Sequence, residues 1–261
     1  MPEGDTLFRT AAGLRPYLVG RDVRAARAQG PGPVPQIQRV VGKRVDAVEA
    51  QGKNLLIRFD GGLELRTHLR MNGSWHRYRP GERWRRPPGR ARLVLEVDGA
   101  VAVCFDAPVV ELFETRAEPL HPSLSRLGPD LLAPDFDGAE ALRRLRSPDR
   151  AELTISAALL DQRALAGIGN IWRNETLFAE KVDPFVRVAD LDDPTLERLV
   201  ATARRLLTAS AGIAPGRAPN QVYRRTGRPC PRCRTAIRSA PLRGEVPRTT
   251  YWCPSCQGGT S

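Results

Sequence analysis

Two pairs of cysteines near the C-terminus constrain this chain more than any other feature of its sequence. The pairs follow the spacing Cys-x2-Cys-x19-Cys-x2-Cys and consist of Cys230, Cys233, Cys253 and Cys256. Each Cys-x2-Cys turn presents two thiolates on one tight knuckle, and Zn²⁺ takes four such ligands in a tetrahedron. Five cysteines in 261 residues are too few for a disulfide scaffold. The spacing therefore predicts a short β-hairpin that folds around one Zn²⁺ ion.

We expect this metal to be structural, because four thiolates leave no open position for metal catalysis. The hairpin between the two pairs carries basic side chains that suit a phosphate backbone, namely Arg234, Arg238, Arg243 and Arg248. The remaining cysteine, Cys104, lies in the apolar run 101–105 and is expected to be a buried strand residue.

The charge of the chain points to a polyanionic partner. Lysine and arginine number 41 against 29 acidic residues, a net charge of +12, and only three of the 41 are lysines. Such an excess favours nucleic acid through phosphate neutralisation, although a ribosomal protein or a merely solvated surface can have the same composition. No apolar run approaches the roughly 20 residues of a membrane helix, and the N-terminus lacks a signal-peptide layout. We therefore expect no membrane partner and a cytoplasmic location.

The first half of the chain has the patterning of a helix followed by many short strands. Apolar residues recur at helical spacing over 6–19, with Asp5 or Thr6 as the N-cap and Gly20 after the last turn. Short apolar or alternating runs follow at 39–48, 54–59, 63–69, 92–97 and 100–105. Glycine-containing turn sequences separate them. Residues 21–118 are therefore predicted to form an antiparallel β-sandwich or barrel.

The second half changes character after a stretch rich in Pro, Gly, Ser and Asp at 121–135, which we interpret as a linker. Helices are predicted at 138–145, 152–165, 169–180 and 194–209. A loop rich in Gly, Pro and Arg spans 212–228 and leads into the cysteine-bearing hairpin.

The N-terminal sequence Met1-Pro2-Glu3-Gly4-Asp5 suggests a nucleophile. Methionine is normally removed before a small residue such as proline, which leaves a secondary amine. An α-amino group has a pKa of about 7.7–8.0, so a substantial fraction is uncharged near neutral pH. Attack of this amine on a sugar C1′ gives a cationic iminium, with Glu3 beside it as general acid or base. The alternative is that these residues are only a polar start to a capped helix.

Five segments in order along the chain are similar to one known family. They are Pro2-Glu3-Gly4, 51–56, 121–130, 160–171 and 248–257. Together they resemble the Fpg/Nei family of bifunctional DNA glycosylases and AP lyases, closest to the endonuclease VIII (Nei) branch of the actinobacterial type. The resemblance covers nearly the whole chain and implies damaged DNA as the partner of a monomeric protein.

The resemblance implies roles for four catalytic residues. Pro2 matches the Schiff-base nucleophile and Glu3 the acid that helps open the deoxyribose and expel the base. Lys53 matches the catalytic lysine, and a lysine in a chain that otherwise uses arginine suggests a need for a titratable amine. Arg248 matches an arginine that grips phosphate. Taken alone, Lys53 is also consistent with a solvated side chain at a strand end.

The resemblance also implies a set of DNA contacts: Arg70, Met71, Arg126, Asn170 and Arg248. Extrusion of a damaged nucleotide leaves a gap in the base stack, and Met71 is the expected wedge with Arg70 toward the orphaned base. Asn170 follows two glycines at a predicted helix N-terminus, where backbone N–H groups can approach a phosphate. The alternatives are a Met71 packed in the core and a helical turn that binds no ligand.

Two departures from the family pattern bear on chemistry and specificity. Thr6 stands where the family usually has an acid, with Asp5 one position earlier. The segment 105–113 lacks the Asp-Pro-Arg-Arg-Phe-Gly sequence of the Fpg branch, and the loop 211–222 is short. These features argue against an 8-oxoguanine specialist and favour oxidised pyrimidines.

The expected fold is α+β and multidomain, with an N-terminal antiparallel β-sandwich and flanking helix, a helix-two-turn-helix domain and a zinc-finger β-hairpin. The predicted domains are 1–120 (catalytic), 121–135 (linker), 136–211 (helix-two-turn-helix) and 212–261 (loop and zinc finger). The predicted activity is excision of oxidised bases followed by β- and δ-elimination. Two alternatives remain: a non-catalytic, zinc-containing DNA-binding protein of this fold, and a zinc-ribbon protein that binds RNA or the ribosome.

Overall fold

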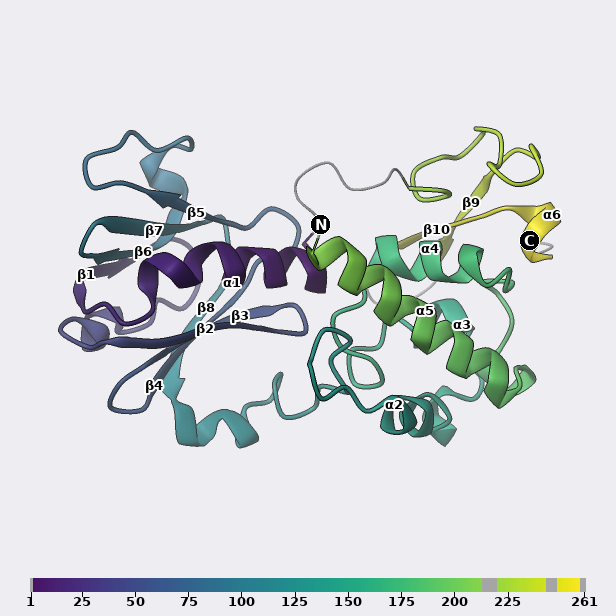
Figure 1. The fold of residues 1–261 in the computed structure, drawn as a ribbon, viewed down its shortest axis with the longest axis horizontal. Coiled ribbons are helices and arrows are strands. Elements are labelled where there is room, and N and C mark those ends of the chain that lie inside the picture. The colour runs from purple at the N-terminus through teal and green to yellow at the C-terminus, as the bar shows by residue number, and fades with distance from the viewer. Residues whose placement is uncertain (1, 213–219, 243–247, 259–261) are drawn as a thin grey trace. The chain divides into compact units, whose positions relative to one another are not determined.

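The computed structural model describes residues 2–212, 220–242 and 248–258, and it divides into two compact units, Met1–Ser125 and Arg126–Ser261 (Figure 1). Each unit has its own hydrophobic core. None of the described helices combines the length and the apolar character that crossing a membrane requires.

The first unit is a β-sandwich with one long helix, α1 (Gly4–Leu18). Its strands are β1 (Val23–Ala28), β2 (Val45–Gln51), β3 (Asn54–Phe59), β4 (Leu63–His68), β5 (Ser74–Tyr78), β6 (Ala91–Val97), β7 (Ala100–Phe105) and β8 (Val109–Glu114). Two antiparallel four-stranded sheets have the orders β1-β6-β7-β5 and β2-β3-β4-β8. Apolar side chains of α1 and of both sheets form the core, which confirms the predicted sandwich.

Two details of the first unit differ from the sequence-based expectation. Helix α1 begins at Gly4, so its N-cap residue is Glu3 rather than Asp5 or Thr6, and Asp5 is buried in the first turn. The run predicted as a strand from residue 39 begins as the 3₁₀ turn η1 (Ile37–Val40). Ile37 and Val40 are buried there, so their apolar character reflects core packing rather than strand pairing.

The second unit is helical, with a β-hairpin near its end. Its elements are α2 (Gly138–Leu145), α3 (Ile155–Ala158), α4 (Asn170–Ala179), α5 (Asp193–Gly212), β9 (Arg238–Leu242), β10 (Arg248–Trp252) and α6 (Pro254–Gln257). Further 3₁₀ turns in the two units are η2 (Pro88–Arg90), η3 (Thr115–Leu120), η4 (Pro148–Arg150) and η5 (Val188–Asp190). The helices enclose a core that includes Leu145, Ile155 and Leu199.

The predicted helix 152–165 is wrong beyond its first turn. The Thr154 side chain caps α3, but the helix ends at Ala158. The carboxylate of Asp161 then accepts a hydrogen bond from the backbone N–H of Arg163 at 3.0 Å, a local bond that competes with helical hydrogen bonding. Leu165 is still fully buried, so the apolar pattern of this segment belongs to packed turns.

Candidate catalytic and metal sites

One end of the first unit carries the β2–β3 turn (residues 52–53) and the β4–β5 loop (residues 69–73, here called the insertion loop). Strand pairing explains why they are neighbours, because Asn54 at the start of β3 pairs with His68 at the end of β4. His68 also pairs with Val109 of β8. The insertion loop joins β4 of one sheet to β5 of the other, so each of its ends is held by a different layer.

Helix α1 brings the N-terminus toward this same end (Figure 1). The N–H of Gly20, just after the helix, donates to the carbonyl oxygen of Val45 at 2.8 Å. Nearer the helix centre, the Arg15 guanidinium donates to the carbonyl oxygen of Val48 at 3.0 Å. The helix therefore runs antiparallel to β2, and its first turn points toward the β2–β3 turn.

The start of the chain places a buried carboxyl group beside Pro2. Glu3 is only 1% exposed, while Pro2 is partly buried. The backbone of Glu3 is extended, its carbonyl oxygen accepts from the N–H groups of Thr6 and Leu7, and its side chain makes no capping hydrogen bond. The carboxyl of Glu3 is thus set in the protein interior without serving as a helix cap.

Asp5 supplies a second buried carboxylate in the first turn of α1. It lies 3.3 Å from the Arg9 guanidinium, and the Thr6 hydroxyl donates to it at 3.4 Å. The first turn of α1 therefore still contains a carboxylate, although position 6 is a threonine. The Thr6 hydroxyl is instead a hydrogen-bond donor to the carboxylate of Asp5, one position earlier.

Lys53 lies in a two-residue hairpin turn whose geometry depends on the glycine before it. Gln51 and Asn54 are the last paired residues of β2 and β3, and Gly52 has φ 58, a left-handed conformation that favours glycine. Lys53 is half-buried, and its positive charge contributes to the environment of His68.

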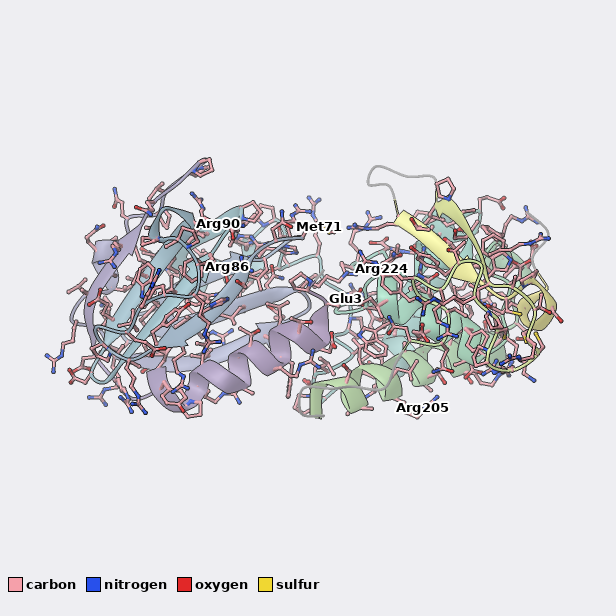
Figure 2. All side chains as sticks on the ribbon, turned by 90° about the horizontal axis from the view of Figure 1, so that it is seen from above. Glu3, Met71, Arg86, Arg90, Arg205 and Arg224 are labelled. Carbon is pink, nitrogen blue, oxygen red and sulfur yellow. The ribbon has the colours of Figure 1, made fainter. Side chains whose placement is uncertain are left out.

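The insertion loop presents Met71 at its tip, with 56% of the residue exposed (Figure 2). The alternative in which Met71 packs in the core is therefore wrong. Arg70 has φ 49, and its N–H donates to Nδ1 of His68 at 3.2 Å. The N–H of Gly73 donates to the carbonyl oxygen of Leu69 at 2.9 Å. A Cβ on Gly73 would lie 2.6 Å from that oxygen, so this tight turn requires glycine.

The environment of His68 keeps its imidazole neutral. Burial, assisted by the positive charges of Arg70, Arg66 and Lys53, lowers the pKa of His68 to about 4. A neutral ring near pH 7 keeps a lone pair on Nδ1, which the N–H of Arg70 requires as its acceptor.

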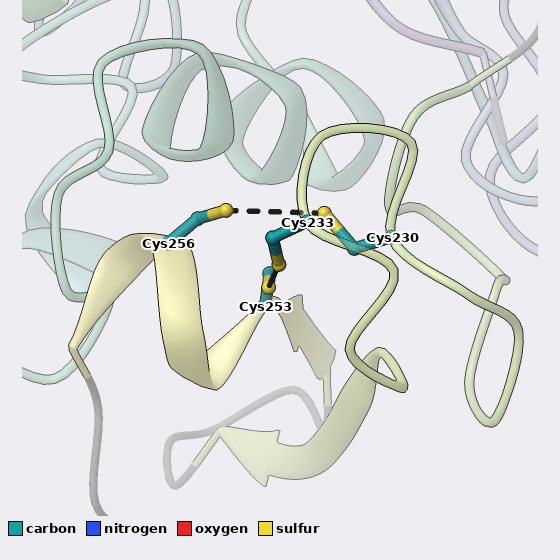
Figure 3. A group of neighbouring side chains, drawn as sticks. All are labelled: Cys230, Cys233, Cys253 and Cys256. Atoms are coloured by element: carbon teal, nitrogen blue, oxygen red, sulfur yellow. Dashed lines mark hydrogen bonds between the residues drawn. The ribbon is translucent and has the colours of Figure 1, made fainter.

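The four predicted cysteine ligands come together in the second unit (Figure 3). Their sulfur atoms all lie within 4.8 Å of one another, with Cys230 and Cys256 3.9 Å apart and Cys233 and Cys253 3.4 Å apart. A tetrahedron with Zn–S bonds of about 2.3 Å has sulfur–sulfur edges of about 3.8 Å. The cluster therefore fits a tetrahedral ion with four sulfur ligands.

The cysteine hairpin is attached to the C-terminal end of α4. The Arg232 guanidinium donates to the carbonyl oxygen of Phe178 at 2.6 Å and to that of Ala179 at 3.1 Å. A cation at the last carbonyl groups of a helix also complements the helix dipole. Next to Cys256, the Gln257 amide donates to the carbonyl oxygen of Val182 at 2.9 Å.

The N-terminal end of α4 places Asn170 against the first residues of β10. The Asn170 amide donates to the carbonyl oxygen of Thr249 at 3.2 Å, and its own oxygen accepts from Arg173 at 2.7 Å. Arg248 directly precedes Thr249 at the start of β10. Arg126, by contrast, is exposed and lines an open pocket that includes neither of these two residues.

The turn before Asn170 is shaped by a residue whose role the sequence did not reveal. The Gln162 amide donates to the carbonyl oxygen of Ile168 at 3.0 Å, and its oxygen accepts from the N–H of Gly167 at 3.1 Å. Gly167 has φ 93, where glycine is favoured. Gln162 lies inside a segment quoted for the family resemblance, so the signal was present without its explanation.

The sequence did not indicate a structural role for Glu175. This buried carboxylate on α4 accepts hydrogen bonds from three consecutive backbone N–H groups, those of Gln221, Val222 and Tyr223, at 2.9–3.1 Å. It fixes the start of the segment that leads into the cysteine hairpin. Arg243, one of the predicted basic residues of that hairpin, and most of the loop 211–222 lie outside the described residues.

Comparisons with known proteins agree with this architecture. The family model of the formamidopyrimidine-DNA glycosylase N-terminal domain matches residues 1–108, and that of the H2TH domain of the same glycosylase matches residues 127–218. The chain is 40% identical to "Probable endonuclease 8 2" of Streptomyces coelicolor, over 99% of this chain and 95% of that protein. It is 38% identical to "DNA-(apurinic or apyrimidinic site) lyase Nei2" of Mycolicibacterium smegmatis, over 98% and 99%.

Solved structures share the fold over the full length. The MutM (Fpg) protein of Thermus thermophilus matches with a TM-score of 0.83 and 28% identity, covering 100% of both chains. A Lactococcus lactis Fpg in complex with DNA containing an abasic site matches with a TM-score of 0.84 and 22% identity, covering 98% of this chain and 100% of that one.

Proposed function

This chain belongs to the Fpg/Nei family of DNA glycosylases, and from that membership we propose that it is a bifunctional DNA glycosylase and AP lyase of base excision repair. The names of its relatives, endonuclease 8 and AP lyase Nei2, support both activities. The observation that carries the proposal is the convergence of the chain start, the Lys53 turn and the exposed Met71 at one end of the first unit. Oxidised pyrimidines are the proposed substrates.

The proposed chemistry starts at Pro2 after removal of Met1. Its secondary amine attacks C1′ of the extruded nucleotide, the bond between C1′ and the damaged base breaks, and the base leaves with a proton from Glu3. The proton of the attacking nitrogen then passes through Glu3 to O4′, the C1′–O4′ bond breaks, and the opened sugar is left as an iminium of Pro2. Loss of a C2′ proton then breaks the C3′–O bond (β-elimination), and a second elimination breaks the C5′–O bond (δ-elimination). Lys53 assists these proton transfers and holds phosphate.

The proposed DNA grip uses residues of both units. Met71 fills the gap left by the extruded nucleotide, and Arg70 faces the orphaned base. Asn170, Arg248 and Arg126 contact the phosphate backbone. Asn170 can do so with its second amide N–H, because the first is directed to β10.

The proposed metal is one structural Zn²⁺ held by the four clustered cysteines. Zinc suits a set of four thiolates that leaves no ligand position open, and it supplies folding energy rather than chemistry. We further propose a monomer that acts in the cytoplasm, at the nucleoid when bound to DNA. The division into 1–120, 121–135, 136–211 and 212–261 remains our proposal for the domains.

Borohydride trapping tests the proposed activity. A duplex with one abasic site should become covalently attached to the wild-type protein, because borohydride reduces the iminium to a stable amine. Without borohydride the same duplex should be nicked. Binding with neither a trapped adduct nor a nick would remove the enzyme and leave the non-catalytic alternative. Tighter binding of RNA than of the abasic duplex would favour the RNA-binding alternative.

The hydrogen bond between His68 and Arg70 predicts how the insertion loop responds to substitution. His68→Ala should weaken binding to a duplex with tetrahydrofuran, an unreactive abasic analogue, by about fivefold, because one hydrogen bond contributes about 1 kcal/mol. His68→Asn should bind within about twofold of wild type, since an asparagine oxygen accepts the N–H two residues along, as in an Asx turn. Equal impairment of the two variants in this binding assay would contradict the loop role of His68.

A further inference from the structure

The connection between β7 and β8 lies beside the insertion loop. Phe105, the last residue of β7, pairs with Ser74, which begins β5, and also with Ala91, which begins β6. Asp106 follows with φ 54, a left-handed turn that directs the chain into β8. The loop 79–90, which joins β5 to β6, returns to this same end of the unit.

The loop 79–90 is fixed by aromatic packing. The Trp84 ring stacks on Tyr78 at 6.1 Å between ring centroids and meets Phe105 edge-on at 5.8 Å. The Tyr78 hydroxyl accepts from the N–H of Arg85 at 3.0 Å. The arginines that follow Trp84 therefore project from an anchored backbone.

Asp106 ties two of these arginines to the insertion loop. Its carboxylate accepts from Arg86 Nη1 at 2.6 Å and from Arg90 Nε at 2.8 Å. The same Nη1 of Arg86 donates to the carbonyl oxygen of Asn72 at 3.3 Å, one residue after Met71. Figure 2 shows Met71, Arg86 and Arg90 on one side of the first unit. Although partial burial opposes it, hydrogen bonding to the two guanidinium groups lowers the pKa of Asp106, which is therefore ionised at neutral pH.

The guanidinium of Arg86 has one edge committed and one edge available. Both of its hydrogen bonds to described residues leave from Nη1, and the side chain is 31% exposed. The Nε and Nη2 groups form the other edge of the planar fork. This edge matches two acceptors side by side, as a lysine ammonium cannot.

We propose that Arg86 contacts DNA beside the gap filled by Met71, and that Asp106 is its positioning residue. The Nε/Nη2 edge donates two parallel hydrogen bonds to a pair of acceptors, either two phosphate oxygens or O6 and N7 of a guanine. This inference rests on the proposed function, because it requires DNA at the insertion loop. The segment 105–113 contains no arginine, whereas the loop 79–90 places Arg86 and Arg90 against Asp106 of that segment.

Neutralising Asp106 distinguishes a positioning role from a purely electrostatic effect, because the two explanations predict opposite changes in DNA affinity. If only charge mattered, Asp106→Asn would remove a repulsive carboxylate and tighten DNA binding. If Asp106 holds Arg86 in place, the same substitution weakens binding. Asparagine is among the residues that tolerate a left-handed backbone, so Asp106→Asn is expected to fold normally.

The test measures dissociation constants for a duplex carrying tetrahydrofuran at one fixed salt concentration. Asp106→Asn and Arg86→Lys should each weaken binding by about tenfold, as expected for loss of one hydrogen bond between charged groups. The double variant should be no weaker than either single variant, because both changes remove the same contact. Arg83→Lys is the matched control from the same loop and should bind like wild type. Unchanged or tighter binding by Asp106→Asn, or additive losses, would overturn the proposal.

Varying the base opposite the tetrahydrofuran distinguishes the two acceptor sources. If Arg86→Lys loses affinity only when guanine is opposite the tetrahydrofuran, the contact is to the base edge. If it loses affinity equally with all four bases, the contact is to phosphate. This assay needs no chemistry. A protein that shows this pattern of binding but traps no reactive abasic DNA would refute the proposed lyase and leave the Arg86 contact standing. No preference of the wild type for the abasic analogue over intact duplex would refute the Arg86 contact itself.

Discussion

Pro2→Gly should reduce borohydride trapping of abasic DNA by at least about a hundredfold, within the range that loss of a positioned catalytic group produces. Proline gives a secondary amine whose iminium is cationic without further protonation, and its ring restricts the chain. Glycine leaves a mobile primary amine, whose imine must gain a proton before it can draw electrons from the sugar. The measurement is the rate of adduct formation under single-turnover conditions.

The control for Pro2→Gly is its affinity for the unreactive tetrahydrofuran duplex, which should equal that of the wild type. Mass spectrometry of both proteins establishes whether Met1 has been removed, since a retained methionine would convert the Pro2 nitrogen into an amide. Trapping at the wild-type rate by Pro2→Gly would contradict the need for a secondary amine, and peptide mapping of the adduct would then show whether the new N-terminal amine or another group is attached. The amine of Lys53, in the turn toward which α1 points, would be the first group to test.

Removal of the metal should unfold the cysteine hairpin and lower DNA affinity by more than about a hundredfold. Structural zinc contributes about 10–16 kcal/mol to the folding of small zinc domains, far more than packing alone provides. Among the residues that the structure describes, the apolar cluster around the hairpin contains five buried side chains, and two of them are the proposed ligands Cys230 and Cys253. A strong chelator and the variant Cys233→Ser should have the same effect, because Cys233 is the exposed member of the cysteine cluster and has little packing to lose.

Cys104→Ala is the matched control, because Cys104 is buried in the sandwich and takes no part in the cysteine cluster. It should retain one zinc per chain by elemental analysis and wild-type affinity for DNA. The circular dichroism of the metal-free protein should keep the strand signal of the first unit. DNA affinity unchanged after complete zinc removal would refute a role of the hairpin in binding.

The site of the expected damage follows from how α4 is held. Its C-terminal end contacts the cysteine hairpin through Arg232, and its N-terminal end contacts β10 through Asn170. Loss of the hairpin therefore removes a partner from each end of the same helix. Asn170 and Arg248 are the proposed phosphate contacts that would lose their mutual arrangement.

Much of the fold could be predicted because local signals and tertiary structure agree. The segments 54–59, 100–105 and 138–145 match β3, β7 and α2 residue for residue. Turn residues bracket the two strands, and the Asp137 side chain caps the helix. The segment 152–165 failed because burial of apolar residues is common to helices and packed turns. Sequence periodicity does not reveal that Asp161 hydrogen-bonds to its own neighbours.

The candidate site also contains residues that local sequence motifs predict and residues that only the tertiary structure brings together. The spacing of the four cysteines is visible in the sequence, and the chain start and the Lys53 turn are local sequence motifs. Arg86 and Asp106, by contrast, lie 20 residues apart and meet only because β5 and β6 both pair with β7. The partners of Glu175 are 46–48 residues away. A pair joined by strand order rather than spacing leaves no pattern in a single sequence.

The insertion loop connects the two sheets of the sandwich, because β4 lies in one sheet and β5 in the other. If Met71 acts as the proposed wedge, the stiffness of its loop depends on the packing between the two sheets as well as on the five residues of the loop. A substitution in the core, far from any nucleotide, would then let the two sheets shift relative to each other. That shift would move the two ends of the loop and weaken the hold on Met71. For this protein, we therefore expect close packing of the sandwich core to contribute to the proposed recognition of damaged DNA.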